Sequence, residues 1–218
     1  MKKIYLVRHA QSHSNVNPFV LQKTANPSIE LTETGIQQVT QTAGFLSDLF
    51  KNNKEKLIIW NSPYKRTRQT ADIIKKSFTG QFVAKESIYL SERQFGLVDD
   101  VANYRHQYLD EVNHYKLHME SKTDFFVRPP LGESPFDMCI RLDSFLKTVI
   151  ETSDATSHII VSHGAAIRGL MMMALDWKFE QYTSEPNPNN AAVFSLKLNH
   201  DKQWINEGYI FKPLNQTA

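Results

Sequence analysis

This chain of 218 residues has one cysteine, a small net charge and few long apolar runs. Cys139 is the only cysteine, so an internal disulfide and a zinc site built from several cysteines are both excluded. Lysine and arginine number 25 against 23 aspartates and glutamates, and the resulting net charge of +2 does not by itself support binding to nucleic acid or to a membrane surface. Any strong positive charge must therefore be local.

The first residues also lack the apolar stretch of a signal peptide or a membrane helix. Met1-Lys2-Lys3 is similar to the charged start of a signal peptide, but Arg8 interrupts the apolar run that follows. We therefore expect a cytoplasmic protein. With 41% hydrophobic residues the chain can bury one substantial core, and its length fits a single domain, residues 1–218, with an insertion.

Apolar residues alternate between strand-like and helix-like patterns along the chain. Short apolar runs predict buried strands at residues 3–8, 57–60 and 158–162. Segments with apolar residues at helical spacing predict helices at 33–52, 64–78, 134–151 and 164–175. Two late segments predict a hairpin, 192–198 and 204–211. The alternation predicts an α/β fold of three layers, α/β/α, with a mostly parallel sheet.

Residues 99–130 interrupt this alternation and are rich in tyrosine, histidine and charge. We interpret them as a helical insertion that covers the site. Its candidates for lining the entrance are aromatic or basic: Tyr104, Tyr108, Tyr115, Phe125, Phe126 and Arg128. The same aromatic residues could instead anchor the insertion to the body of the protein.

Three of the predicted strands end in residues suited to binding an anion. Arg8-His9 follows the first strand, Ser62 to Arg66 follows the second, and Ser162-His163-Gly164 follows the third. Ligands of open parallel sheets bind at the carboxyl ends of the strands, so these segments are expected to meet. Arginine forks and the free N–H groups of a first helical turn favour phosphate, and a neutral imidazole can act as a nucleophile.

At these residues the chain resembles the histidine phosphatase superfamily, the phosphoglycerate-mutase-like group, in its phosphatase branch. Six blocks occur in the family's order, at residues 6–15, 31–35, 62–71, 90–96, 132–134 and 161–164. The resemblance implies that His9 forms a phosphohistidine, which water then hydrolyses, and that Glu92 is the acid that protonates the leaving oxygen. Arg8, Arg66 and His163 would supply positive charge or hydrogen bonds, and no metal or cofactor would be required.

Two further residues are candidates for holding the phosphoryl group. Asn15 can donate a hydrogen bond, and Gly164 would let the backbone approach a ligand closely. The chain departs from the family at Ala10, where glycine is common, and at Gln11, where glutamate is frequent. Gln11 cannot titrate, so any role of that acid in the family is in doubt here.

The remaining histidines and serines invite other interpretations. His13 lies in a loop without a matching cluster of ligands, which does not favour a metal site. His114 and His118 would share one helical face and, with His106, are expected to be solvated or to face substrate rather than to bind a metal. Ser62 is expected to be a turn or capping residue.

Three functions fit these observations. The first is a phosphatase that acts on a phosphorylated small molecule or a phosphoprotein. The second is a cofactor-dependent phosphoglycerate mutase, which the insertion disfavours because Arg128 and Arg105 are not an adjacent pair able to hold a substrate carboxylate. The third is a non-catalytic phospholigand-binding or scaffold protein, which would need neither His9 nor Glu92. Nucleic-acid and membrane partners are not expected, and the sequence leaves the oligomeric state open.

Overall fold

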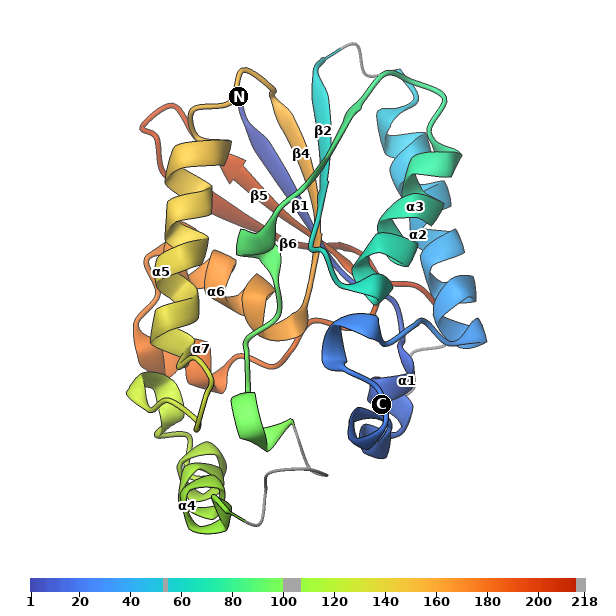
Figure 1. Cartoon of the computed structure of the whole chain (residues 1–218). Coiled ribbons are helices and arrows are strands. Elements are labelled where there is room, and N and C mark those ends of the chain that lie inside the picture. Colours follow the sequence, from blue (N-terminus) through green and yellow to red (C-terminus); the bar gives the residue numbers. More distant parts are fainter. Residues whose placement is uncertain (53–54, 100–106, 215–218) are drawn as a thin grey trace.

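The computed structural model describes residues 1–52, 55–99 and 107–214. Within this part of the chain, the strands form one sheet in the order β3-β2-β4-β1-β5-β6 (Figure 1). Their bounds are β1 Lys3–Arg8, β2 Leu57–Asn61, β3 Val83–Glu86, β4 Ser157–Ser162, β5 Val193–Leu198 and β6 Trp204–Phe211. The first four strands are mutually parallel, whereas β5 and β6 are antiparallel to their neighbours. The predicted mostly parallel sheet and late hairpin are thus confirmed.

Helices cover both faces of the sheet (Figure 1). One face carries α2 (Glu33–Phe50) and α3 (Lys65–Ser77), and the other carries α5 (Pro135–Phe145) and α6 (Gly164–Leu175). Strand β1 shows why two helical layers are needed, because its side chains alternate between two separate apolar clusters. Ile4 and Leu6 join the cluster on the α5 and α6 side, while Tyr5 and Val7 join the one beneath α2 and α3. The three-layer α/β/α fold is confirmed.

Parallel pairing sets the levels at which the central strands end. Arg8 lies opposite Ser162, the last residue of β4, and Asn61 at the end of β2 lies opposite Val161. The ladder continues one step further, since the backbone N–H of His9 donates to the Ser162 carbonyl at 2.8 Å and that of Ser62 donates to the Val161 carbonyl at 3.1 Å. The three strand ends therefore open onto one edge of the sheet.

The predicted insertion is helical where it is described. Helix α4 spans Leu109–Glu120, and a single 3₁₀ turn follows at Asp124–Phe126. Residues 100–106, including Tyr104, Arg105 and His106, lie outside the described residues.

Two aromatic side chains of this segment anchor it instead of lining an entrance. Tyr115 is buried and donates its hydroxyl to Asp124 at 3.1 Å, and Asp124 pairs with the buried Arg93 at 2.9 Å. Phe125 is also buried, with its ring against that of Tyr182. Tyr108 and Phe126 remain exposed, the latter at 62%. Arg128, another candidate for the entrance, is held by both carboxylate oxygens of Asp137 at 2.6 Å.

Several short elements were not predicted from the sequence. Strand β3 is exposed along its length and has no apolar face to mark it. Helices α1 (His13–Val16) and α7 (Phe179–Ser184) are too short to show a helical period. In α2, the apolar residues Ile36 and Leu49 are exposed at 47% and 45%. The helix is long enough for its apolar residues to extend beyond the stripe that meets the sheet.

Cys139 is buried in the cluster beneath α5 and α6, as a small apolar residue would be. Among the described residues, every helix is too short or too polar to cross a lipid bilayer.

Candidate active site

The two candidate histidines, 154 positions apart in the sequence, meet at the edge where the central strands end. The ring centroids of His9 and His163 are 5.3 Å apart, in an edge-to-face arrangement. Both side chains are buried. The structure therefore brings together residues that the sequence predicted to meet, and the reason is the common level of the β1 and β4 ends.

His9 has a defined protonation pattern. Its Nδ1 lies 2.8 Å from the Ala10 carbonyl oxygen, which can only accept, so Nδ1 carries the hydrogen. Its Nε2 accepts a hydrogen bond from Arg66 Nε at 3.2 Å and therefore presents a lone pair. Burial holds the pKa of His9 well below its ordinary value, and the charges of Arg66 and Arg8 lower it further. The sequence pointed to the arginines, whereas burial has the larger effect.

Arg66 lies in the first turn of α3 and is only 4% exposed. Its Nη1 donates to the backbone carbonyl and to the side-chain oxygen of Asn26, at 2.8 and 2.9 Å. Its guanidinium also lies over the Tyr64 ring, 4.9 Å from the centroid. Burial lowers the pKa of Arg66, and the carboxylate of Glu92 opposes this more than any other acidic group. The guanidinium is fixed in place with its Nε directed at the His9 imidazole.

His163 caps the start of α6 and has no exposed surface. Its Nε2 lies 2.8 Å from the Ser62 hydroxyl, and its ring packs edge-on against Tyr64 with centroids 4.8 Å apart. Burial is the main reason that the pKa of His163 is well below its ordinary value, followed by the charge of Arg66. The imidazole is accordingly neutral at pH 7. Its Nδ1 is buried and has no hydrogen-bond partner within the described part of the chain.

Arg8, the residue before His9, has another buried nitrogen without a hydrogen-bond partner in the described part of the chain. Its Nη1 donates to the Pro188 carbonyl at 2.6 Å, while its buried Nε has no hydrogen-bond partner among the residues described. Buried donors are nearly always paired in folded proteins, so such atoms at one place indicate a site for an acceptor ligand. A phosphoryl group offers acceptor oxygens of the right charge.

Glu92 is half-buried and is held by its neighbours. Its Oε1 accepts from the backbone N–H of Arg93 at 2.9 Å, and its backbone carbonyl accepts from Arg141 at 3.2 Å. The carboxylate also acts on Arg8, because it raises the pKa of that guanidinium against the stronger lowering caused by burial. The charge of Glu92 thus acts on both candidate arginines.

The two candidate phosphate-holding residues have different surroundings. The amide oxygen of Asn15 caps α1 by accepting from the Ser12 backbone at 2.9 Å, so only its amide nitrogen would serve a ligand. Asn190 joins this residue to His9, because its amide donates to the His9 carbonyl at 2.9 Å and to Asn15 at 3.3 Å. A Cβ at Gly164 would lie 2.7 Å from the Asn187 side chain, so the small residue makes room for a loop of the protein.

Gln11, one of the departures from the family pattern, has a structural contact. Its side-chain oxygen accepts from the Thr32 hydroxyl at 2.7 Å, and Thr32 in turn caps α2. A Cβ on Gly35 would lie only 2.1 Å from the Gln11 carbonyl. These contacts pack the segment after β1 closely against the start of α2.

Sequence reasoning missed three residues around the nucleophile. Tyr64 and Asn26 position Arg66, and Asn190 holds the backbone of His9. Tyr64 could have been suspected from its place between Ser62 and Arg66. Asn26 begins a three-residue 3₁₀ helix and Asn190 lies in a turn, and neither segment has a sequence signal.

No group of three or more histidine, cysteine, aspartate or glutamate side chains suited to a metal occurs in the part of the chain that the structure describes. His114 and His118 do share one face of α4, as predicted, with their Nε2 atoms 3.2 Å apart.

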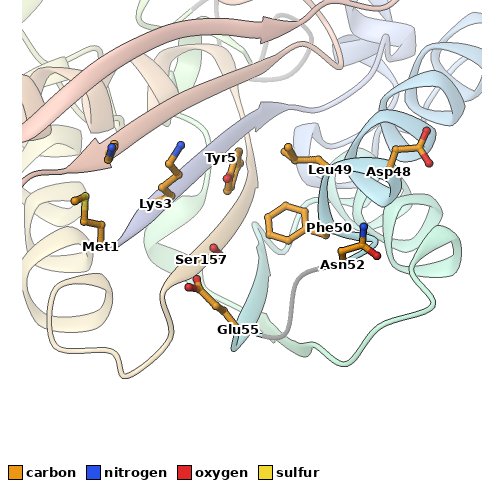
Figure 2. A pocket seen from close by; sticks show the side chains of 10 residues that line it. Met1, Lys3, Tyr5, Asp48, Leu49, Phe50, Asn52, Glu55 and Ser157 are labelled. Carbon is orange, nitrogen blue, oxygen red and sulfur yellow. The ribbon is translucent and has the colours of Figure 1, made fainter.

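A sizeable pocket lies far from these residues. Figure 2 shows it beside the amino end of β1, where Lys3, Tyr5 and Ser157 line a volume of about 670 Å³. His9 follows the opposite end of the same six-residue strand, roughly 20 Å away at about 3.3 Å per residue. This pocket is therefore separate from the candidate active site.

Known structures share this fold. One is a mycobacterial glucosyl-3-phosphoglycerate phosphatase in complex with VO3, with a TM-score of 0.74, 19% identity, and coverage of 96% of this chain and 98% of that one. Another is a phosphoserine phosphatase mutant from Entamoeba histolytica in complex with phosphoserine, with a TM-score of 0.71, 22% identity and 96% coverage of both chains. These similarities show that the chain shares its three-layer α/β fold with these proteins.

The sequence comparison identifies the family. The profile of the histidine phosphatase superfamily (branch 1) matches residues 4–209, and the chain belongs to that superfamily. The phosphoglycerate mutase-like protein AT74 from Arabidopsis thaliana is 30% identical over 213 residues, which cover 90% of this chain. This chain spans 65% of the length of AT74.

Proposed function

We propose that this protein is a phosphatase that hydrolyses phosphate monoesters through a phosphohistidine on His9. The observation that carries the proposal is the lone pair on His9 Nε2, held beside Arg66, with unpartnered donors on Arg8 and His163 in the same buried site. A nucleophile in this setting suits phosphoryl transfer, in which charge spreads over the oxygens of the transferring group.

In the first step His9 Nε2 attacks phosphorus, and the bond from phosphorus to the ester oxygen breaks. The low pKa of His9 keeps its lone pair available at neutral pH. Substrate oxygens replace the nitrogen lone pair as the acceptor for Arg66 Nε, which frees the nucleophile. Protonated Glu92 donates its proton to the leaving oxygen. The products of this step are an alcohol, a phosphohistidine and the Glu92 carboxylate.

In the second step water attacks phosphorus from the side that the alcohol has left. The Glu92 carboxylate accepts a proton from this water, the bond from nitrogen to phosphorus breaks, and inorganic phosphate is released. Arg8, Arg66 and His163 bind the phosphoryl oxygens in both steps, with the amide of Asn15 and the backbone at Gly164 as further donors. These groups provide the positive charge and hydrogen bonds that the reaction needs, so the proposed mechanism is independent of metal ions and cofactors.

The substrate is proposed to be a small phosphorylated molecule, with a phosphoprotein as the alternative. The structurally similar proteins named as phosphatases act, by their names, on glucosyl-3-phosphoglycerate and phosphoserine. A phosphoglycerate mutase is the second candidate, because the relative AT74 is named mutase-like. Hydrolysis is favoured over it because Arg128 is occupied by Asp137 and is not available for a substrate carboxylate. The cytoplasmic location stays a prediction.

One assay distinguishes the candidates. The purified, EDTA-treated protein is incubated with a chromogenic aryl phosphate and, separately, with 3-phosphoglycerate and a bisphosphoglycerate primer. We expect release of phosphate from the first and no isomerisation of the second. Isomerisation would establish a mutase, and phosphate binding without either reaction would establish a non-catalytic binding protein. His9→Ala is expected to abolish turnover while it retains most of the affinity for phosphate.

A further inference from the structure

The Ser62 hydroxyl and the His163 imidazole form a buried hydrogen bond. Both side chains have no exposed surface, and the Ser62 hydroxyl lies 2.8 Å from His163 Nε2. The hydroxyl oxygen also accepts, at 3.4 Å, from the backbone N–H of Tyr64. Ser62 is thus a turn residue, as the sequence suggested, and it additionally contacts a group in the candidate active site.

The hydrogen-bond inventory fixes the direction of this contact. A neutral imidazole carries one hydrogen, on either Nδ1 or Nε2, and a hydroxyl can donate only one. Among the described residues, His163 Nε2 is the only acceptor bonded to the Ser62 hydroxyl, because its other partner, the Tyr64 N–H, is a donor. If Nε2 carried the hydrogen, the buried hydroxyl proton would have no acceptor, which is unfavourable. Ser62 therefore donates, and His163 carries its hydrogen on Nδ1.

The other ring nitrogen of His163, Nδ1, is then a hydrogen-bond donor. Its Nδ1 is buried and unpartnered, and its ring lies against that of His9. With hydrogen on Nδ1, the neutral ring can donate to an oxygen of the phosphoryl group on His9. With hydrogen on Nε2 instead, the Nδ1 lone pair would repel the same oxygen.

We propose that Ser62 is a positioning residue that holds His163 in the Nδ1–H tautomer, so that this imidazole donates a hydrogen bond to the transferring phosphoryl group. The second half of this proposal rests on the proposed phosphatase function, whereas the tautomer itself does not. Ser62 touches neither the substrate nor the reacting atoms, and its effect passes entirely through His163.

The direct test is nitrogen NMR of protein labelled with ¹⁵N in its histidine rings. A protonated ring nitrogen and an unprotonated one resonate in well-separated regions, so the tautomer of His163 can be read without any assay of activity. The His163→Gln variant assigns the signals. We expect the wild type to show hydrogen on Nδ1, Ser62→Ala to lose this preference, and Ser62→Thr to keep it because threonine retains the hydroxyl.

Kinetics provides the second readout. Loss of one preorganised donor costs about 10²–10³-fold in kcat, and Ser62→Ala is expected to approach the lower end of that range, with a smaller change in KM. Ser62→Thr should recover most of the rate. Thr67→Val is the matched control, because the Thr67 hydroxyl donates to the Ser62 carbonyl at 2.8 Å in the same buried turn but is not bonded to His163. It should leave the His163 signals unchanged.

The outcomes separate this inference from the proposed function. Hydrogen on Nε2 of His163 in the wild type would overturn the inference, whatever the activity. The expected tautomer in a protein that hydrolyses no phosphate ester would leave the hydrogen-bond assignment intact and overturn its catalytic use together with the phosphatase proposal. If folded Ser62→Ala has an altered His163 tautomer but a normal kcat, the tautomer does not affect the reaction, and the catalytic part of the inference is overturned.

Discussion

Replacing Arg66 with methionine tests the electrostatic part of the mechanism. The substitution keeps the length of the side chain and removes a buried guanidinium that donates to His9 Nε2 at 3.2 Å. In the reaction this group would supply at least one donor to the phosphoryl oxygens, together with a full positive charge. One such donor is worth about 10²–10³-fold in rate, so we expect kcat/KM of Arg66→Met to fall by at least about 10³-fold, or about 4 kcal/mol.

The same variant should move the acid limb of the pH profile. The charge of Arg66 lowers the pKa of His9, and its removal raises that pKa toward the ordinary value without reaching it, because burial and Arg8 still act. The imidazole then becomes protonated, and loses its nucleophilic lone pair, at a higher pH than in the wild type. The fall in kcat/KM on acidification is therefore expected to begin at a higher pH in Arg66→Met.

The assay is hydrolysis of an aryl phosphate across the pH range, with circular dichroism to confirm that the variant is folded. Arg68→Met is the matched control, since Arg68 lies on the exposed side of α3 and pairs with Glu86 at the surface. It should keep kcat/KM within about twofold of the wild type. A loss of less than tenfold in folded Arg66→Met, or an acid limb that does not move, would refute the reasoning.

Three further predictions concern the acid, the fold at low pH and the anchoring of the insertion. Glu92→Gln should lower kcat/KM, which reports on formation of the phosphohistidine, by about 10²–10⁴-fold for alkyl phosphates and by much less for p-nitrophenyl phosphate, whose leaving group needs no proton; equal losses of kcat/KM would exclude Glu92 as the acid. Burial lowers the pKa of His158 to about 4, so its contribution to the free energy of unfolding is complete above pH 6.5 and is lost as the pH falls to about 4. Urea denaturation of His158→Gln should show a smaller fall in unfolding free energy over that pH range than the wild type. An unchanged dependence on pH would contradict the assignment. Asp124→Asn leaves Arg93 buried without its carboxylate partner and should lower the free energy of unfolding by about 3–5 kcal/mol. The control is Lys147→Met, which removes the partner of Asp143 at the surface and should leave the urea midpoint unchanged. Similar urea midpoints for the two variants would contradict this ranking.

Sequence reasoning succeeded where the pattern reflects burial on two sides. The middle residues of β1, β2 and β4 are apolar because helices cover both faces of these central strands, and their parallel order brings Arg8, His9 and His163 to one edge. The chemistry of that edge was therefore accessible without coordinates. The tautomer of His9 was not, because it depends on a contact with the Ala10 carbonyl that no residue type reveals.

The sequence was less informative about the side chains that surround the site. Tyr115 and Phe125 looked like candidates for contact with substrate, but the ion pair between Arg93 and Asp124 draws this segment inward and buries them. Asn26 and Asn190 hold Arg66 and the backbone of His9 through a few hydrogen bonds from short connecting segments. Such contacts have no periodicity and depend on the tertiary structure alone.

The central claim is that phosphate is transferred to the ring of His9. The most direct measurement is rapid quenching in alkali during turnover of a ³²P-labelled phosphate ester, followed by mass spectrometry of the labelled peptide. We predict an alkali-stable, acid-labile phosphoryl group on the peptide that contains His9, and none in His9→Ala. Label on a different residue, or undiminished hydrolysis by His9→Ala, would contradict the account.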